Sequence, residues 1–297
     1  MSTSGIRVWR SLLFVPANVV RFVDKARSSG ADAIQLDLED AVAPKEKAAA
    51  RRAVATAADR VSREGAGVVV RINRPLALAL PDIDASVGPH VGALALPKIM
   101  GPDHVRLLSE VVAEAERRAG IAVGSTRFIL MIETAEAALR VRDIASADPR
   151  VVGLTLGSED LATEFGVDPG SDVLATHHAT LVAAAVAARI APLGLVGSIA
   201  EFRDLTAFGA VVRRSREFGY RGASCIHPAQ IPMLNAAFTP TRDEVERAST
   251  IVAAYDEAHA RGEGAISLDG RMIDVPVAER ARALLASYEA TLPHAHV

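Results

Sequence analysis

Short apolar runs recur along the chain at intervals of roughly 25 to 35 residues, each of a length typical of a buried strand. There are eight of them: SLLFV, AIQLDL, GVVVRI, GALAL, FILMI, VVGLTL, GLVGSI and GASCI. Most are separated by segments of helical periodicity, such as residues 45–61 and 103–120, which end near glycine as helices often do. Because strands that alternate with helices pair in parallel, we predict an α/β fold, a closed (β/α)8 TIM barrel.

The interval between the third and fourth apolar runs is the least regular part of this pattern. Residues 74–88, RPLALALPDIDASVG, contain two prolines and give only a weak helix signal. A doubly wound open sheet therefore stays open as the alternative architecture.

The pattern changes after the eighth run. Residues 227–264 predict two further helices, and residues 265–290 predict a short ordered loop followed by a helix. We therefore expect a barrel over residues 1–238 and a C-terminal helical extension over residues 239–297.

Composition narrows the class of protein. Half of the 297 residues are hydrophobic, which is ample for one large core. The net charge of -3 and the low aromatic content argue against a nucleic-acid-binding surface, which needs a clustered basic face, and leave small anionic substrates open. The chain shows no Gly-rich phosphate loop, dinucleotide fingerprint, H-E-x-x-H or G-x-S-x-G motif.

Cysteine content and the N-terminus bear on the compartment. The single Cys225 lies in an apolar run, so we expect a buried thiol and no disulfide framework. The N-terminal apolar segment is too short for a signal peptide, and no stretch reaches the length of a membrane span. These features predict a cytoplasmic protein without a membrane partner.

Polar residues follow nearly every apolar run, at the strand ends where the active sites of α/β barrels are built. They are Asn18, then Asp37, Glu39 and Asp40, then Arg71 and Asn73, then Lys98, Glu133, the trio Ser158, Glu159 and Asp160, Ser198, and His227. The sequence therefore predicts that these side chains meet at one mouth.

Glu133 raises a particular question, because it directly follows the buried run ILMI and a buried carboxylate needs a partner. Asp160 stands one βα unit further on, so both carboxylates can reach one ion. Oxygen ligands without cysteine or histidine suit Mg²⁺, with Mn²⁺ as the alternative. Salt bridges to Arg71 and Lys98 explain the same residues equally well, and the residues alone do not choose.

Two basic residues at the strand ends have their own alternatives. Arg71 would be a fixed cation facing a carboxylate or a developing oxyanion, or else a structural partner for LDLED. Lys98 could form a Schiff base in a metal-independent aldolase, but the acidic pair favours metal chemistry.

Eight motifs, in a fixed order along the chain, resemble those of a known protein family. They are RSLLFVPAN, GADAIQLDLEDAVAPKEKAAAR, VRIN, ALPKI, LMIETAEA, LGSEDLA, CIHPAQI and LDGRMIDVP. In this order they resemble the citrate lyase β-subunit-like branch of the HpcH/HpaI aldolase superfamily, over Arg10 to about Arg282. The closing DGRMIDVP resembles stand-alone acyl-CoA lyases, which act on malyl-CoA, β-methylmalyl-CoA or citramalyl-CoA.

The resemblance implies a homotrimeric or hexameric TIM barrel with Mg²⁺ held by Glu133 and Asp160. It implies that Arg71 binds substrate near the thioester and that Glu39 and Asp40 act around the metal waters. Asp274 would lie on a C-terminal lid that covers a neighbouring subunit's site, as acid or base. Arg21 and Lys25 are the candidates for binding the coenzyme A phosphates.

The implied reaction is cleavage of a 3-hydroxy-3-carboxyacyl-CoA to acetyl-CoA and a 2-oxo acid. Three alternatives stay open: a malyl-CoA thioesterase, the citryl-cleaving β subunit of a citrate lyase complex, and a non-catalytic barrel scaffold. One departure puts the substrate in doubt, since many relatives have Asp-Gly where this chain reads LVGSIAEF, with Ser198 or Glu201 in that part of the mouth.

Overall fold

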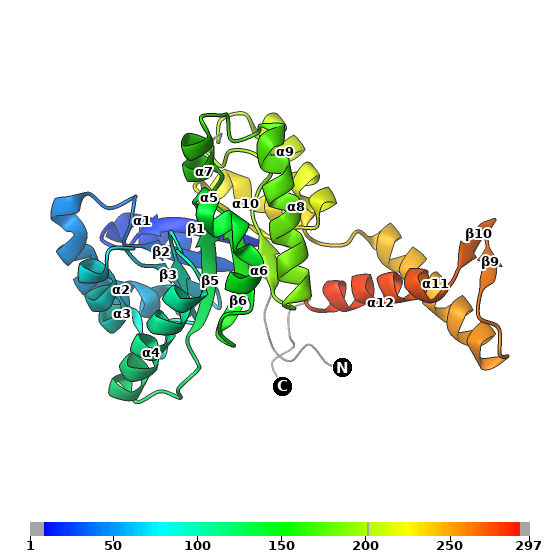
Figure 1. The fold of residues 1–297 in the computed structure, drawn as a ribbon, viewed down its shortest axis with the longest axis horizontal. Coiled ribbons are helices and arrows are strands. Elements are labelled where there is room, and N and C mark those ends of the chain that lie inside the picture. The colour runs from blue at the N-terminus through cyan, green and yellow to red at the C-terminus, as the bar shows by residue number, and fades with distance from the viewer. Residues whose placement is uncertain (1–8, 201, 292–297) are drawn as a thin grey trace. The chain divides into compact units, whose positions relative to one another are not determined.

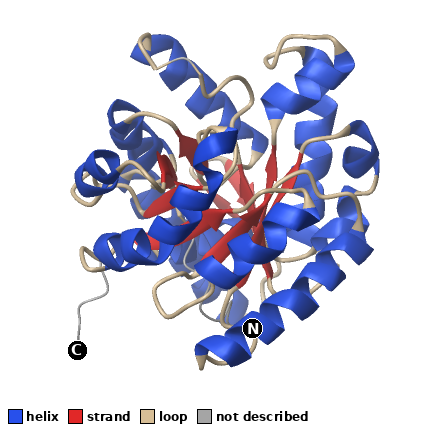
Figure 2. Ribbon diagram, turned by 90° about the vertical axis from the view of Figure 1, so that its left-hand side faces the viewer, coloured by secondary structure: helices blue, strands red, loops and turns tan. Residues whose placement is uncertain are grey.

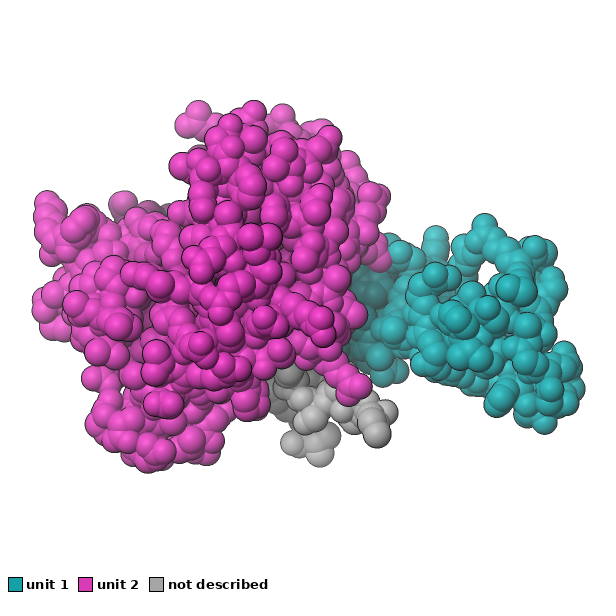
Figure 3. Space-filling view, viewed as in Figure 1, with its two compact units in different colours: residues 1–8, 237–297 teal, residues 9–236 magenta. Residues whose placement is uncertain are grey.

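The computed structural model describes residues 9–200 and 202–291. These residues fall into two compact units, residues 9–236 and residues 237–291, which Figure 3 distinguishes by colour. Each unit is described by itself below.

A single parallel sheet forms the centre of the first unit, with helices outside it (Figures 1 and 2). Within the described residues its eight strands are β1 (Ser11–Pro16), β2 (Ala33–Asp37), β3 (Gly67–Arg71), β4 (Ala93–Leu96), β5 (Arg127–Ile132), β6 (Val151–Leu156), β7 (Ala191–Leu193) and β8 (Ala223–Cys225). Strands β1 to β7 are neighbours in chain order, and β8 pairs with β1.

The sheet curls round until its two edges meet. Leu193 at the end of β7 forms a parallel bridge with Gly222, directly before β8, and the amide of Gly194 donates to the carbonyl of Gly222 at 2.8 Å. The ring of strands is therefore nearly closed. The predicted TIM barrel is confirmed, and the alternative of an open doubly wound sheet is wrong.

The helices of this unit lie in the intervals between strands. They are α1 (Val20–Ala26), α2 (Lys47–Ser62), α3 (Leu76–Ser86), α4 (Pro102–Ala119), α5 (Ala135–Leu139), α6 (Val141–Ala145), α7 (Ser158–Phe165), α8 (Asp172–Ala187), α9 (Leu205–Phe218) and α10 (Ile231–Ala237), with the 3₁₀ helices η1 (Pro44–Glu46) and η2 (Pro228–Gln230). Throughout the described ranges, no helix combines the length and the apolar character needed to cross a bilayer.

Helix boundaries follow local sequence signals. Helix α4 has Pro102 in its first turn and ends at Gly120, whose φ of 68° is a conformation that glycine adopts without strain. Helix α3 contains Pro81 in its interior, so it lacks the backbone hydrogen bond that residue 81 would otherwise donate to the carbonyl of Ala77. The weak signal of residues 74–88 therefore did correspond to a helix.

The barrel interior is an apolar core. Side chains that alternate along the strands fill it from within, among them Leu12, Val69, Ala95, Ile129 and Leu193. Cys225 on β8 is buried as expected, and burial raises the pKa of its thiol to about 12, so it is not a reactive nucleophile.

The seventh strand differs from its prediction. The apolar run GLVGSI was expected to form it, whereas β7 is Ala191–Leu193 and that run follows the strand as a loop. Gly194 and Gly197 have φ values of 151° and 145°, which take the backbone out of regular strand geometry. Apolar composition alone does not reveal such a bend, because the loop is as buried as a strand.

The second unit is a small helical module. It contains α11 (Arg242–Ala260), a hairpin of β9 (Ile266–Leu268) and β10 (Arg271–Ile273), and α12 (Val275–Glu289). Tyr255, Ile273 and Ala278 form its core. The predicted ordered loop is therefore a two-stranded hairpin, whose turn residues Asp269 and Gly270 both have positive φ values.

Candidate active site

A cavity of about 390 Å³ opens at the carboxyl ends of the barrel strands. Its floor consists of apolar residues shared with the barrel core, and its rim consists of charged residues that follow the strands. Chemistry in α/β barrels collects at this end, because loops from all eight strands converge there.

Arg71 is fixed at the rim by Asp37. The two residues are direct neighbours in the register of β2 and β3, and two nitrogens of Arg71 donate to the two Asp37 oxygens at 2.7 Å each. The guanidinium also lies 4.7 Å from the centroid of the Phe14 ring. Burial disfavours ionisation of Asp37, but the bonds from Arg71 outweigh it and lower its pKa.

Glu39 and Asp40 share the remaining terminal nitrogen of Arg71. Its Nη1 lies 3.0 Å from Glu39 Oε2 and 3.2 Å from Asp40 Oδ2. Only the contact to Asp40 has hydrogen-bond geometry, so the buried Glu39 oxygen has a charge partner without a hydrogen bond. Burial raises the pKa of Glu39 to about 7 against the opposing field of Arg71, with Asp40 and Glu133 nearby.

Glu133 is pressed against the backbone of the next strand end. It follows β5, and the amide of Gly157 after β6 donates to the carbonyl of Ile132 at 2.8 Å. A Cβ atom on Gly157 would lie 2.3 Å from Glu133 Cγ, so glycine is required here for space. One Glu133 oxygen accepts the Lys98 amide at 2.6 Å, yet burial still raises the pKa of this carboxyl to about 7.

Asp160 lies in the first turn of α7 rather than on a strand. The ammonium of Lys98 is 3.4 Å from Asp160 Oδ1 and 3.6 Å from Glu39 Oε1. Lys98 itself has a φ of 49°, a strained conformation for a residue with a side chain. Burial disfavours its charge, but these carboxylates raise its pKa, which is the wrong direction for a Schiff-base lysine.

The carboxylates in the mouth suit a divalent cation. The mouth brings the carboxylates of Asp37, Glu39, Asp40, Glu133 and Asp160 together with only Arg71 and Lys98, among the described residues, as cations in contact with them, and burial raises the pKa values of Glu39 and Glu133 to about 7. No three His, Cys, Asp or Glu side chains of the described residues form a complete cage, but Mg²⁺ characteristically takes one or two carboxylates and fills its shell with water and substrate oxygens. Glu133 and Asp160 fit that role, provided that Lys98 moves off Asp160.

The acidic loop after β2 is held from behind. Lys47 Nζ donates to the carbonyls of Leu38 and Glu39 at 2.8 and 2.6 Å. The side-chain amide of Asn73 donates to the Leu38 carbonyl at 2.9 Å, and the buried Asp82 accepts from that amide at 2.6 Å. These bonds fix the backbone that carries Glu39, because they satisfy its carbonyls away from water.

Within the described ranges, the other residues predicted from the sequence form no side-chain hydrogen bond or ion pair with Arg71, Glu133 or Lys98. Arg21 and Lys25 are exposed on α1, which follows β1 at the mouth end of the barrel. Ser198 donates a hydrogen bond to Glu159 at the rim, and Glu201 lies outside the described residues. Asp274 belongs to the second unit, where it caps α12 by accepting the Val277 amide at 3.3 Å.

Several residues that organise the site were not singled out from the sequence. Phe14 lies against the Arg71 guanidinium, and Gly157 makes room for Glu133. Asp37, which holds Arg71, was predicted at the mouth from its place at the end of β2. The need for glycine at position 157 carries no comparable signal, because it depends on a neighbouring strand.

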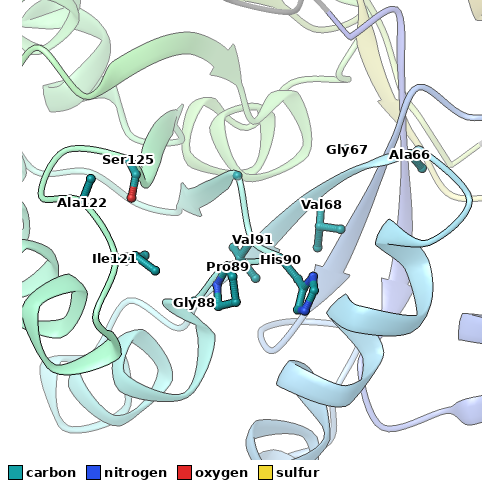
Figure 4. A pocket seen from close by; sticks show the side chains of 11 residues that line it. Ala66, Gly67, Val68, Gly88, Pro89, His90, Val91, Ile121, Ala122 and Ser125 are labelled. Atoms are coloured by element: carbon teal, nitrogen blue, oxygen red, sulfur yellow. The ribbon is translucent and has the colours of Figure 1, made fainter. Parts of the chain in front are cut away.

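A second cavity of about 460 Å³ lies at the opposite end, beside the amino ends of β3, β4 and β5. Figure 4 shows its lining of small and apolar residues from three loops, with His90 at one side. His90 contacts the Ser62 hydroxyl at 3.2 Å and the Asp59 carboxylate at 3.6 Å. Both partners have further contacts, because Ser62 donates to the Asp59 carbonyl and Arg63 binds the Asp59 carboxylate. These side chains bind one another at the surface, and none of them directs a charge into the cavity, so we do not assign it a catalytic role.

A family model described as HpcH/HpaI aldolase/citrate lyase matches residues 10–228, which is most of the chain and includes every strand of the barrel. The chain belongs to this family. The HpcH/HpaI resemblance of the sequence motifs is thereby confirmed.

Three relatives in this family illustrate its range. The chain is 34% identical to citrate lyase subunit beta of Leuconostoc mesenteroides subsp. cremoris, over 94% of this chain and 93% of that protein. It is 34% identical to a (3S)-malyl-CoA thioesterase of Cereibacter sphaeroides, with 95% of each chain covered. The crystal structure of protein CitE from Mycobacterium tuberculosis, in complex with magnesium, acetoacetate and coenzyme A, has a TM-score of 0.74 and 27% identity, covering 94% of this chain and 97% of that one.

Proposed function

We propose that this protein is a Mg²⁺-dependent lyase that cleaves a 3-hydroxy-3-carboxyacyl-CoA to acetyl-CoA and a 2-oxo acid. The proposal depends on one observation. The Glu133 side chain packs against Gly157, so its carboxylate lies at the rim with those of Asp160 and Glu39. Membership in a family with citrate lyase β subunits supports the reaction class. The CitE structure with magnesium and coenzyme A supports the ion and the thioester.

Glu133 and Asp160 would hold the metal, with Mn²⁺ as the alternative ion. When bound, Mg²⁺ supplies a Lewis acid for the hydroxyl and carboxylate oxygens of the substrate. Lys98 then leaves Asp160 and keeps its contact with Glu39, since both carboxylates lie within 4 Å of its ammonium in the structure.

The protein residues carry the rest of the reaction. The substrate hydroxyl gives its proton to Glu39 through an ordered water. The bond between the hydroxyl-bearing carbon and the thioester methylene then breaks, and its electron pair stays on the thioester as an enolate. Arg71 stabilises that negative charge, because Asp37 and Phe14 hold its guanidinium still. Exposed Asp40 can release Arg71 Nη1 to the substrate, while Glu39 orders the waters at the metal.

Protonation of the enolate is assigned to Asp274. Its place before α12 supports a position on a lid, and the resemblance implies that the lid covers the site of another copy in a trimer or hexamer. Arg21 and Lys25 are exposed on α1, and we assign them to the coenzyme A phosphates.

A thioesterase is the second candidate, because one relative of equal identity is a (3S)-malyl-CoA thioesterase. The same enolate-forming site would admit water to the thioester carbonyl and leave the carbon–carbon bond intact. Hydrolysis releases free coenzyme A and an intact hydroxy acid, whereas the lyase releases acetyl-CoA and an oxo acid.

The experiment incubates the protein and Mg²⁺ with malyl-CoA, citramalyl-CoA and citryl-CoA, and identifies the products by mass. Acetyl-CoA with an oxo acid is the expected result, and free coenzyme A without an oxo acid would establish the thioesterase instead. Glu133→Gln should abolish turnover with an unchanged circular dichroism spectrum. The matched control Glu136→Gln alters an exposed carboxylate on α5 and should leave the rate unchanged.

A further inference from the structure

The charge of the cavity lining restricts the group that the oxo-acid half of the substrate can carry. Resting on the proposed function, we propose that this substituent is hydrogen or a small apolar group such as methyl, and not a second carboxylate. The argument combines the charge of the rim, the composition of the floor and the direction from which coenzyme A must enter.

The rim of the cavity is strongly acidic. Among its lining residues, all within the described part of the chain, Arg71 is the only basic side chain. The lining carboxylates are Asp37, Asp40, Glu133, Glu159 and Asp160. Since Arg71 already contacts Asp37 and Asp40, it has little charge left for a second carboxylate of the substrate.

Below the rim the lining is neutral. Leu12, Ala95, Ile129 and Leu193 form the floor, and Met131 lies above them on β5. The polar side chains at this level are Gln35, Thr155 and Ser224, and the Ser224 hydroxyl contacts Gln35 Oε1 at 3.4 Å. These groups can solvate a hydroxyl or a carbonyl, but none of them neutralises a negative charge.

The size of coenzyme A sets the orientation. A cavity of about 390 Å³ holds a small acid but not the cofactor, so the thioester arm extends outward through the mouth. The oxo-acid half is then the inner half, and its carboxylate would face the ion that Glu133 and Asp160 would hold. Its substituent points toward Met131, Ile129 and the neutral lining.

A carboxymethyl substituent would therefore bury a second anion in the neutral lining below the rim, where none of the lining side chains is a cation. A methyl group would instead contact apolar side chains. Differences of one methylene change kcat/KM by about 10- to 200-fold. A buried charge without a partner costs at least as much as the upper part of that range. We expect kcat/KM for citryl-CoA to be at least about 100-fold below that for citramalyl-CoA.

The test has a binding arm and a turnover arm. Calorimetry measures the Kd values of pyruvate, 2-oxobutanoate and oxaloacetate for the full-length protein in Mg²⁺, and the turnover arm compares malyl-CoA, citramalyl-CoA and citryl-CoA. Pyruvate and 2-oxobutanoate should each bind at least about tenfold more tightly than oxaloacetate. Thr155→Lys, which adds a cation to the cavity, should narrow or reverse that preference, whereas Thr176→Lys on the exposed face of α8 should not.

Two results would overturn the inference. One is oxaloacetate binding as tightly as the apolar acids, and the other is no binding of any of the three. Failure of the proposed function gives a different result, because none of the three thioesters would then be cleaved. The order of the oxo-acid Kd values would still test the inference in that case.

Discussion

Two buried arginine–carboxylate pairs lie at opposite ends of the same barrel and differ in how completely they are satisfied. Arg71 pairs with Asp37 at the mouth, and Arg150 pairs with Glu116 at the amino ends of the strands. Both pairs have bidentate contacts, and each arginine lies over a phenylalanine ring. Their surroundings decide what each can do.

The pair at the amino ends is closed. Arg150 also donates to Ser109 and to the Thr126 carbonyl, while Glu116 accepts the amides of Gly124 and Thr126. Burial opposes ionisation of Glu116, but these donors lower its pKa to about 2. Such a site holds loops together and has no capacity for a ligand.

The pair at the mouth is open. Arg71 extends its Nη1 to Glu39 and Asp40, and further carboxylates follow at Glu133 and Asp160. Here burial raises the pKa values of Glu39 and Glu133 to about 7. The difference teaches that a ligand site is marked by carboxylates without enough partners, and that buried charge alone does not mark one. Cavity size does not mark it either, because the cavity of about 460 Å³ lies at the other end of the barrel and that of about 390 Å³ at the mouth.

The matched variants Arg71→Lys and Arg150→Lys test this contrast most strongly. Both lose a bidentate contact to a buried carboxylate, so each should lower the free energy of unfolding by about 2–4 kcal/mol, measured by urea denaturation. Only Arg71→Lys should also lower kcat, by about 10³-fold per folded molecule. A comparable loss of kcat in Arg150→Lys would mean that the closed pair takes part in the reaction.

Gly157→Ala and Gly92→Ala compare one glycine at each end of the barrel. A Cβ at position 157 would strike Glu133 at 2.3 Å, whereas a Cβ at position 92 would meet only the Val68 carbonyl at 3.7 Å. We expect Gly157→Ala to lower kcat by about 10²-fold, because a carboxylate displaced by about 1 Å loses its geometry. Gly92→Ala should change the rate less than twofold; equal rates in both variants would separate Glu133 from the reaction.

The pH dependence of stability should differ in sign between the two ends. Glu39 and Glu133 keep protons in the folded state up to pH 7, whereas an unfolded glutamate releases its proton near pH 4.5. The free energy of unfolding should therefore fall by about 2 kcal/mol as pH rises from 4.5 to 7, and Mg²⁺ should reduce that fall. Glu116 contributes the opposite slope, present above pH 4.5 and lost toward pH 2.

Thermal unfolding at pH 5.0, 6.0 and 7.5, with and without Mg²⁺, measures this effect. Glu133→Gln should reduce the fall in stability between pH 5 and 7 to roughly half, because Glu39 still contributes. A slope that persists unchanged in this variant would show that other groups account for it.

The barrel could be predicted from the sequence because its evidence is local and repeated. Apolar strand runs and helical segments alternate, and polar residues such as Arg71 and Glu133 follow the runs directly. The bounds of the seventh strand could not be predicted, because GLVGSI has the composition of a strand. Its backbone bends at Gly194 and Gly197, so β7 ends before this run.

The inner organisation of the site was harder to predict, because it depends on contacts between strands. Nothing near Gly157 in the sequence indicates that Glu133 will lie against it. Lys98 contacts two carboxylates distant in sequence, Glu39 in the loop after β2 and Asp160 on α7. Lys98 contacts Asp160 as the salt-bridge alternative predicts, whereas Glu133 accepts the backbone amide of Lys98 instead of forming an ion pair.

The most direct measurement is a calorimetric titration of Mg²⁺ into the wild type, Glu133→Gln and Asp160→Asn, with Glu136→Gln as the surface control. The account predicts one Mg²⁺ per chain in the wild type and in the control, and affinity reduced at least about 100-fold in each of the two mouth variants. Binding of wild-type strength to Glu133→Gln, or no binding to the wild type, would contradict it.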